Sequence, residues 1–441
     1  MQNKRLAVIS VVAAVALSAI PLAYAIGARS GGPSADDLAL FDGVVQLVER
    51  GYVHPVNAHQ LTKDALKGML NRLDPHSDYM DEQEFKESQS NISGKFGGLG
   101  IEISEQGGVP KVISPIDGTP AAHAGLQPGD LIVAIDGQSA QGQSLDKVVR
   151  MLRGEPGTKV TITILRGNTK PFDVTIVRAI IQVQTVKSKL EPNGIGYVRI
   201  TEFGETTPED FNKAIDDLKR QAGGTLKGLV LDLRNDPGGL LTSAVAVAGN
   251  FLDGGTVVTI KGRNREDNHA YKGQPSGAID AKLPVVVLIN GASASASEIV
   301  AGALQDRHRG VIMGTTSFGK GSVQTIIPLN GHGALRLTTA LYYTPGGRSI
   351  QGQGIAPDVV VEAPKEQQIA GAFLPSESTL AGAFTNPGSL NQPPAKGDQS
   401  KPAAAASSKN SPPIKGELIG TDNDDQLKAA LTRLQEMISK G

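Results

Sequence analysis

The chain has 441 residues, a formal net charge of −1 and no cysteine, and glycine (53) and proline (26) are frequent. This length predicts two or three domains. The near-zero charge, without a basic block, argues against nucleic acid as a partner. The absence of cysteine excludes disulfides, thiol catalysis and thiolate metal sites. The seven histidines are scattered without a metal-binding pattern, so we expect neither a metal nor a cofactor.

The first segment is typical of a secretory signal. Lys4 and Arg5 precede an apolar run over residues 6–19, and Ala23-Tyr24-Ala25 has the small-residue form of a cleavage site. We predict that residues 1–25 are a signal peptide cleaved after Ala25. The alternative is an uncleaved membrane anchor, because residues 6–26 are long enough to span a bilayer. Both interpretations predict an exported protein of the periplasm or cell envelope. An uncleaved anchor would in addition hold the protein at the inner membrane.

Residues 36–94 are predicted to form a helical N-terminal region. Pro75 breaks this pattern within the segment 73–77, because proline removes a backbone donor. A packing or dimerisation module is the expected role, which makes a homodimer a candidate assembly. The apolar residues that recur at helical spacing are Leu38, Phe41, Val45, Val48, Leu61, Ala65, Met69 and Leu73.

Residues 95–182 resemble a PDZ domain, a β-rich α+β fold that binds peptide C-termini by strand addition. A glycine loop at 96–100 enters an alternating strand, and a capped amphipathic helix over 144–152 precedes another strand at 160–165. The alternative for the loop alone is a flexible turn. The resemblance implies that a terminal carboxylate would bind the amides of Gly98, Leu99 and Gly100. The side-chain groove would be lined by Ile101, Ile103, Val148 and Leu152.

Residues 183–363 alternate strands with helices, which predicts an α/β domain. Pro208 lies in the first turn of a helix expected to end near Gln221. The polar run 262–280 is expected to be a surface loop, which could cover a site as a flap. Residues 364–415 are rich in small and polar residues and predict a disordered linker, and residues 416–441 carry a final helix with an apolar stripe. The expected strands are 195–200, 229–233, 257–260, 285–289, 311–313, 323–327 and 334–342.

Ser295 is a candidate nucleophile at the junction of a strand and a helix, where the helix N-terminus favours developing negative charge. Ser293 and Ser297 compete with it. A structural role is the alternative, because Ser295-x-x-Glu298 also has the spacing of a capping box.

Lys320 is a candidate base for that serine, and it lies between Gly319 and Gly321. A lysine acts as a base only when its surroundings lower its pKa. If the strand over 323–327 continued from Lys320, two-residue alternation would place Gln324 on the same face, where it could orient the amine. The alternative is an ordinary solvated lysine.

Together these stretches resemble the carboxy-terminal processing peptidases, also called tail-specific proteases. The matching motifs lie at 293–306 and 318–324, with further matches at 73–77, 232–235 and 343–350. The resemblance implies that Ser295 is the nucleophile, Lys320 the general base and Gln324 its orienting partner. It implies an oxyanion hole made by the amides of Gly239 and Ala296. The family turn often has three glycines, but this chain has Pro237-Gly238-Gly239, so the first donor is either Gly238 or Gly239.

The expected function is that of a serine endopeptidase with a crotonase-like core, which cuts exported proteins with apolar C-termini near that end. The PDZ domain would present the C-terminus, and an adaptor or activator protein is a candidate partner. The alternative is a non-catalytic PDZ scaffold. A phosphate-binding loop is excluded because Gly321, and not Ser or Thr, follows Lys320. A Ser–His–Asp triad is excluded because Asp306 and His308 lie about 16 to 20 Å along the helix from Ser295.

Overall fold

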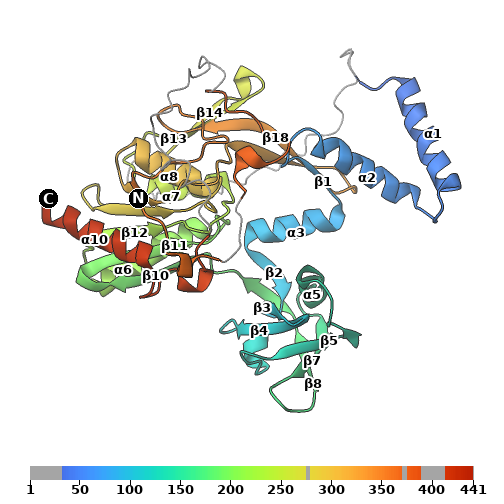
Figure 1. The fold of residues 1–441 in the computed structure, drawn as a ribbon, viewed down its shortest axis with the longest axis horizontal. Coiled ribbons are helices and arrows are strands. Elements are labelled where there is room, and N and C mark those ends of the chain that lie inside the picture. The colour runs from blue at the N-terminus through green and yellow to red at the C-terminus, as the bar shows by residue number, and fades with distance from the viewer. Residues whose placement is uncertain (1–31, 275–278, 370–374, 389–412, 441) are drawn as a thin grey trace, which may run out of the picture. The chain divides into compact units, whose positions relative to one another are not determined.

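The computed structural model describes residues 32–274, 279–369, 375–388 and 413–440 (Figure 1). The chain divides into two compact units, residues 1–65 and 66–441. The predicted signal peptide or anchor lies outside the described residues. Within the described ranges, no helix combines the length and the apolar composition needed to cross a bilayer.

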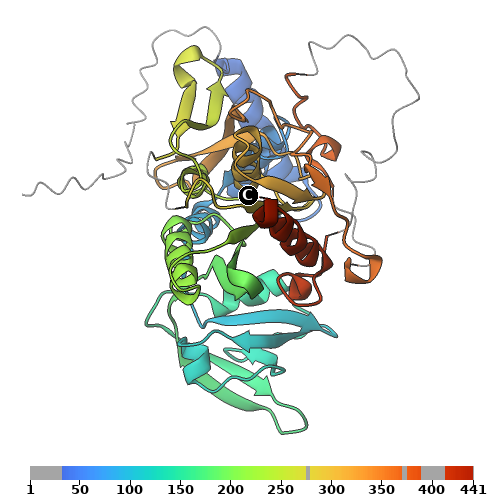
Figure 2. The same ribbon diagram turned by 90° about the vertical axis from the view of Figure 1, so that its left-hand side faces the viewer.

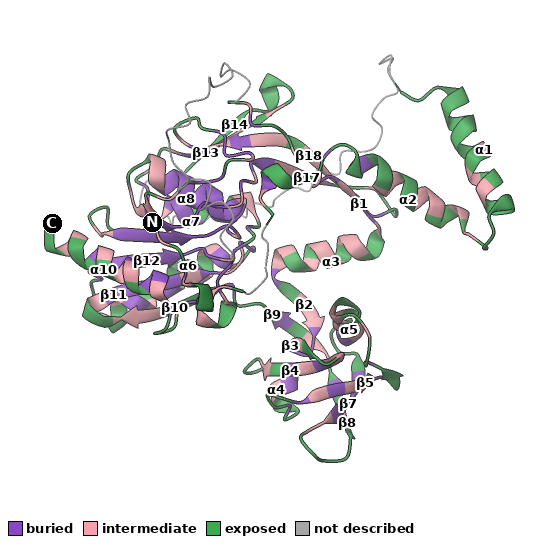
Figure 3. Ribbon diagram, in the orientation of Figure 1, coloured by how far each residue is buried: buried purple, intermediate pink, exposed green. Residues whose placement is uncertain are grey.

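The first unit contains α1 (Ala35–Gly51) and the start of α2 (Ala58–Asn71). Ser34 caps α1, since its side chain accepts the amide of Asp37 and Asp37 accepts the amide of Ser34 in return. None of the residues of α1 is buried, and its large apolar side chains, such as Leu47 (72% exposed), face solvent (Figure 3). The predicted helices are therefore present, and none of the described residues of α1 is buried in a core.

The second unit begins with the end of α2, followed by β1 (Asp78–Met80) and α3 (Glu82–Ser93). The PDZ-like region follows, built around a sheet in the order β3-β4-β5-β7-β8, with β6 paired to β5. β2 (Lys95–Gly98) pairs with β9 (Ala179–Gln182) at the two ends of this region. Its other elements are β3 (Ile101–Gln106), β4 (Val109–Pro115), α4 (Pro120–His123), β5 (Leu131–Ile135), β6 (Gln138–Ser139), α5 (Leu145–Leu152), β7 (Lys159–Leu165) and β8 (Phe172–Val177).

A six-stranded sheet in the order β10-β11-β12-β15-β16-β19 forms the centre of the catalytic region. β10 is antiparallel to β11, and the remaining neighbours are parallel. Every residue of β12 and β15 is buried, as expected for parallel strands covered on both faces. The strands are β10 (Val186–Glu191), β11 (Ile195–Ile200), β12 (Gly228–Asp232), β15 (Val285–Ile289), β16 (Val311–Gly314) and β19 (Val359–Val360).

Helices cover both faces of this sheet. On one face, Val285 and Val287 pack with α6 (Thr207–Gln221), α7 (Leu241–Gly249) and α8 (Ala296–Asp306). On the other face, Val286 and Leu288 pack with Leu427, Ala430 and Leu434 of α10 (Asp425–Lys440). Figures 1 and 2 both place α10, drawn in dark red, against the sheet. The stripe of the last helix therefore packs on its own chain.

A second, five-stranded sheet carries the lysine side of the predicted site. It runs in the order β1-β18-β13-β14, and β17 also pairs with β18. Its strands are β13 (Thr256–Gly262), β14 (His269–Lys272), β17 (Ser322–Pro328) and β18 (Ala334–Tyr343), besides β1. Part of the expected loop at 262–280 is thus the strand β14, which pairs with β13. The segment 73–77 leads directly into β1, so it joins the catalytic region rather than a separate helical module.

The predicted linker over 364–415 is partly wrong. Gln367 is buried in a short 3-10 helix, η3 (Lys365–Gln367), and Ile414 forms a bridge to Gln368. Residues 375–388 also pack on the core and include the fully buried Glu377 in η4 (Glu377–Thr379). The composition suggested disorder because large apolar residues are few, but buried polar contacts hold these pieces in place. The rest of the predicted linker lies outside the described residues.

Candidate active site

Ser295 lies in a tight turn between β15 and α8, directly before the first helical residue, Ala296. Its backbone φ is +55°, a left-handed value that is uncommon for a residue with a side chain. Strained residues of this kind persist where the surrounding structure fixes them, and they cluster at functional sites. Buried α8 and the buried strand before the turn supply that support.

The two competing serines bind backbone groups. The Ser293 hydroxyl donates to the Leu233 carbonyl oxygen (2.7 Å) and accepts the Asn290 amide (2.9 Å). The Ser297 hydroxyl donates to the Asp236 carbonyl oxygen (3.2 Å). Both side chains are buried in these roles. Of the three serines, Ser295 is the one that lines an open cavity.

That cavity, about 470 Å³ in volume, brings the predicted catalytic residues together. Ser295 comes from the turn before α8, Lys320 from the turn before β17, Gln324 from β17 itself, and Gly239 from the turn after β12. Residues from separate segments of the sequence thus meet at one place.

Lys320 is partly buried in the wall of this cavity. Burial lowers the pKa of its ammonium group, and nearby Arg336 acts in the same direction. Three carboxylates oppose this effect, namely Glu377, Glu298 and Asp74. The net lowering of the pKa favours the neutral amine, which is the form that can take a proton.

Glu298 links the turn of Ser295 to the turn of Lys320. Its Oε2 accepts the amide of Ser295 (2.8 Å) and the amide of Lys320 (3.0 Å). Its Oε1 accepts the Ser317 hydroxyl (2.5 Å) and the Gly319 amide (2.7 Å). Burial raises the pKa of Glu298 to about 7, and these hydrogen bonds limit the rise. The predicted capping box is therefore present in the contact from Glu298 to Ser295, and it also fixes the lysine.

The strand over 323–327 does not continue from Lys320, although Gln324 and Lys320 do line the same cavity. β17 begins at Ser322, two residues after Lys320, and the register shifts between Val323 and Gln324. The extra residue of this bulge, Thr339, lies on β18, so β17 keeps its two-residue alternation, and Ser322, Gln324 and Ile326 all line the cavity. The Gln324 amide nitrogen donates to the hydroxyls of Ser322 (3.0 Å) and Thr338 (3.2 Å).

The turn at 237–239 lies against Ser295. A side chain at Gly238 would meet Cβ of Ser295 at 2.8 Å and the Ala296 amide nitrogen at 3.0 Å. The Gly238 amide donates to Oδ1 of Asp236 (2.8 Å), whose pKa is raised well above its usual range by burial. Gly239, with φ of +141°, lines the cavity.

Five of the seven predicted PDZ residues are buried, namely Gly98, Leu99, Gly100, Val148 and Leu152. Gly98 ends β2, Leu99 and Gly100 form the loop, and Gly100 has φ of +77°. Val148 (0% exposed) and Leu152 (5% exposed) are buried in the core of this region. Ile101 and Ile103 are partly buried and pack against that core, so they are the accessible apolar wall.

Several residues of the site were not predicted. The Tyr342 hydroxyl donates to the carbonyl oxygens of Ser295 (3.1 Å) and Lys320. Asp74 accepts the Thr338 hydroxyl (3.0 Å), which in turn accepts from Gln324, so the segment 73–77 supports the site. The spacing Ser295-x-x-Glu298 was a usable signal for Glu298. Asp74 lies in the matching motif at 73–77, but its contact with Thr338 is between residues far apart in the sequence. Tyr342 carried no local signal, because its contacts are with residues far away in the sequence.

Two alternative sites find no support. Asp306 is the last residue of α8 and His308 follows the helix, which is continuous from Ala296, so a Ser–His–Asp triad with Ser295 stays excluded. In the described part of the chain, no three histidine or carboxylate side chains gather as a metal site would require.

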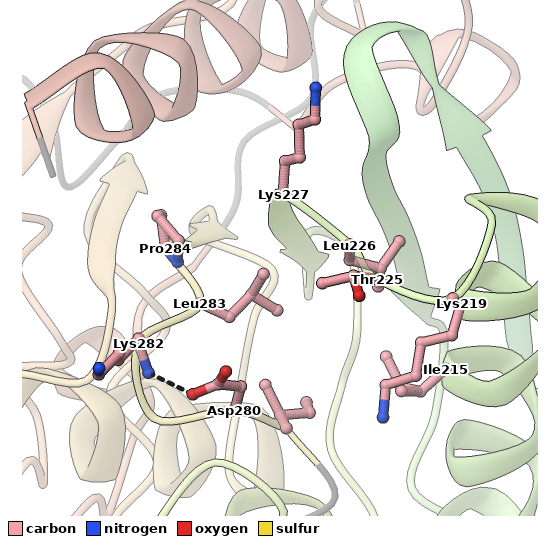
Figure 4. A pocket seen from close by; sticks show the side chains of 11 residues that line it. Ile215, Lys219, Thr225, Leu226, Lys227, Asp280, Lys282, Leu283 and Pro284 are labelled. Carbon is pink, nitrogen blue, oxygen red and sulfur yellow. Dashed lines mark hydrogen bonds between the residues drawn. The ribbon is translucent and has the colours of Figure 1, made fainter.

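A second cavity, about 240 Å³ in volume, lies away from Ser295 (Figure 4). It is lined by apolar side chains such as Leu226 and Leu283 and by three lysines, Lys219, Lys227 and Lys282. Asp280 accepts the Lys282 amide there (2.9 Å). It contains none of the predicted catalytic residues.

Comparison with known proteins identifies the family of this chain. Residues 194–361 match peptidase family S41, residues 111–166 a PDZ domain, and residues 26–84 the N-terminal domain of the activating protease CtpB. A carboxy-terminal-processing protease of Bartonella bacilliformis is 49% identical over 380 residues, which are 85% of this chain and 87% of that protein. The carboxy-terminal processing protease CtpA of Bacillus subtilis is 33% identical over 361 residues, 82% of this chain and 76% of that protein.

Among solved structures, a photosystem II D1 C-terminal processing protease aligns with a TM-score of 0.43 and 31% identity, over 74% of this chain and 93% of that chain. On its sequence relationships, this chain belongs to peptidase family S41 and is a serine-type, carboxy-terminal processing protease with a PDZ domain. Its substrates are accordingly proteins, and its PDZ domain is a peptide-binding module. A non-catalytic scaffold does not fit this assignment.

Proposed function

We propose that this protease cuts exported proteins near their C-terminus with a Ser295–Lys320 dyad, after its PDZ domain binds the free C-terminal carboxylate. The observation that carries the proposal is the shared cavity, in which Ser295, Lys320, Gln324 and Gly239 meet. The lowered pKa of Lys320 supports its role as general base. A crotonase-like core is part of the proposal, supported by the parallel strands with helices on both faces.

In the proposed mechanism, the Ser295 hydroxyl attacks the scissile carbonyl carbon while its proton passes to the Lys320 amine. The bond from carbon to nitrogen then breaks, the leaving amine takes that proton, and an acyl-enzyme remains. Water hydrolyses this ester with Lys320 again as the base. Both hydrogens of the Gln324 amide nitrogen have hydroxyl acceptors, so its oxygen is the atom that can accept from Lys320.

The negative oxygen of the intermediate would bind the amides of Gly239 and Ala296. Two observations favour Gly239 over Gly238 as the first donor. The Gly238 amide already donates to Asp236, and Gly239 is the glycine of the pair that lines the cavity. Ala296 supplies the first amide of α8, where the helix dipole adds to the stabilisation.

The test is cleavage of an unstructured protein with an apolar C-terminus by wild type, Ser295→Ala and Lys320→Ala, with Lys213→Ala as an exposed-lysine control. We expect both active-site variants to lose at least about 1,000-fold in kcat/KM with unchanged melting, because the nucleophile or its base is absent. The control should match wild type. Cleavage by Lys320→Ala would show that another base acts. A folded but inert wild type would indicate that the proposed adaptor or activator is required.

The docking step has its own test in the same assay, in which the substrate is a peptide with a free or an amidated C-terminus. Removing the carboxylate should raise KM strongly, because the amides near Gly98–Gly100 would lose their anion. Equal rates for the two peptides would remove PDZ docking from the mechanism and leave the dyad untouched.

The proposal also covers assembly and location. The exposed apolar side chains of α1 support a homodimer through that helix, whereas α10 is already packed on its own sheet. A lower mass in sedimentation for Leu47→Glu would support this interface, and an unchanged mass would oppose it. The leader-like sequence at 1–25 supports export to the periplasm or cell envelope. Amino-terminal sequencing separates cleavage before Ile26 from an anchor over 6–26.

A further inference from the structure

A buried carboxylate, Glu377, lies beside the proposed base, beyond the S41 match that ends at residue 361. Its side chain is fully buried. Nε2 of His76 contacts its two oxygens at 3.0 and 2.9 Å, and the Gln351 amide nitrogen donates to it at 2.9 Å. A buried charge is costly unless it is hydrogen-bonded, so these contacts define a built site and not an incidental one.

The contacts of Glu377 hold the turn that carries Lys320. The Glu377 amide donates to the carbonyl oxygen of Phe318 (3.0 Å). Gln351, which binds the Glu377 carboxylate with its nitrogen, accepts the Gly321 amide with its oxygen (2.8 Å). The lysine is therefore held on both sides, at residues 318 and 321, by one connected set of contacts.

The close packing of this turn leaves it little freedom. A side chain at Gly321 would meet the backbone nitrogen of Gln351 at 2.7 Å, and one at Gly319 would meet the backbone nitrogen of Gly354 at 3.0 Å. The turn is thus pressed against the segment 351–354, which Glu377 binds through Gln351. Removing the Glu377 carboxylate would loosen the segment that positions Lys320.

Glu377 also faces Lys320 electrostatically. The charged groups around the lysine are Glu377, Glu298 and Asp74, which favour the ammonium, and Arg336, which opposes it. Of the charges that favour the ammonium, Glu377 acts most strongly. The imidazole of His76 is a titratable group in direct contact with the Glu377 carboxylate.

We propose that Glu377 is a positioning residue for Lys320: held by His76 and Gln351, it fixes the turn 318–321 and presents a negative charge to the lysine. This inference rests on the proposed role of Lys320 as the base. It assigns part of the active site to the segment 375–388, which lies outside the matched catalytic domain.

The test compares full-length wild type, Glu377→Gln and Glu377→Asp by kcat and KM over a range of pH, with Lys320→Ala assayed in parallel. Glu366→Gln, on the exposed side of η3, makes the same chemical change away from the site. We expect Glu377→Gln to lower kcat by about tenfold or more with little change in KM, because the base is misplaced. The acidic limb of its profile of kcat against pH should move to lower pH, because the pKa of Lys320 falls when the lysine loses a negative neighbour.

Glu377→Asp should keep the limb near its wild-type position, since the charge is retained, and Glu366→Gln should match wild type throughout. A wild-type pH profile for Glu377→Gln, with Lys320→Ala inert, overturns the inference and leaves the dyad standing. A lower kcat with an unmoved limb also overturns it, because a merely structural residue would act that way. An active Lys320→Ala overturns the dyad and this inference with it.

If the melting temperature of Glu377→Gln is far below that of wild type, the variant His76→Phe tests the role of Glu377 by the same measurements of kcat and KM against pH. It removes a donor to the carboxylate and leaves the charge of Glu377 less compensated beside the lysine. The acidic limb should then move to higher pH, opposite to Glu377→Gln, with a lower kcat. A limb that stays in place for a folded His76→Phe overturns the inference.

Discussion

At the scale of single residues, the site depends on backbone positions that only certain side chains allow. Ser295 adopts a left-handed φ of +55°, and Gly238, with φ of +103°, lies against it. The amide of Gly238 binds Asp236, which leaves the next glycine facing the cavity. The close approach of these two turns explains why the first of the two glycines cannot carry a side chain.

Gly238→Ala is therefore expected to abolish most activity. The added methyl would meet the Ala294 carbonyl oxygen at 2.7 Å and Ser295 Cβ at 2.8 Å, so the serine turn and the oxyanion donors must move. Displacing one such donor typically costs about 10² to 10³ in kcat. We expect a loss of at least about 100-fold in kcat/KM, measured by peptide cleavage.

Gly331→Ala is the matched control for this prediction. Gly331 also has a left-handed φ, +77°, but a side chain there would meet nothing within 4 Å. Gly331→Ala should lower the free energy of unfolding by only about 1 kcal/mol, because of its backbone conformation, and should keep a near-normal kcat/KM. Similar activity losses for the two alanines would mean that φ strain, and not contact with Ser295, is responsible.

At the scale of elements, α10 is attached to the central sheet by a buried ion cluster as well as by its apolar stripe. Arg234, after β12, binds Asp232 (2.6 Å) and Asp424 (2.5 Å), and all three are fully buried. Gln426 also accepts from Arg234 (3.0 Å). The same turn continues into Asn235, whose side chain donates to the Ile414 carbonyl oxygen (3.0 Å), so the C-terminal segment supports the turn at 235–239.

Asp424→Asn is expected to destabilise the protein by about 3 kcal/mol, because it leaves Arg234 buried with one carboxylate in place of two. The exposed Asp422→Asn, two residues earlier, should change the free energy of unfolding by less than about 0.5 kcal/mol. Urea unfolding followed by circular dichroism measures both. Equal stabilities for the two variants would show that the cluster adds nothing beyond the apolar packing of α10.

How far the sequence predicted these elements depends on where the information lies. The strand 285–289 and the helix ending at Gln221 were predicted with their observed ends, since local composition determines both. The strand of Gln324 does not extend back to Lys320, because β17 begins at Ser322, where its pairing with β18 begins. Glu377 was missed because its neighbours have the composition of a linker, and its burial comes from distant residues such as His76.

The catalytic residues themselves were named from motifs, which indicate residue identity but not the contacts around it. Ser295 and Lys320 do line one cavity, whereas the role of Glu298 in holding both turns required the structure. Their chemical roles stay predictions until the variants are assayed.

At the scale of the whole molecule, the active site places buried acids in the core, and this sets how stability depends on pH. The pKa of Glu298 is raised to about 7 and that of Asp236 well above its usual range, in both cases mainly by burial. The native state therefore holds these protons more tightly than the unfolded chain does. Among the buried acids, Asp74, Asp130 and Asp424 have lowered pKa values and act in the opposite sense, but only below about pH 4.

Stability should therefore fall as the pH rises from about 4.5 to about 7. For Glu298 the pKa is raised by about 2.5, which at about 1.4 kcal/mol per pH unit gives about 3.5 kcal/mol, and Asp236 adds to it. Thermal melting of the wild type at pH 5 and pH 7.5 measures the effect, and the midpoint should be lower at pH 7.5. Glu298→Gln, which cannot titrate, should show a smaller difference, while the exposed Glu366→Gln should keep the full one. A wild-type midpoint that rises with pH would mean that the four hydrogen bonds to Glu298 outweigh its burial and keep it ionised in the native state.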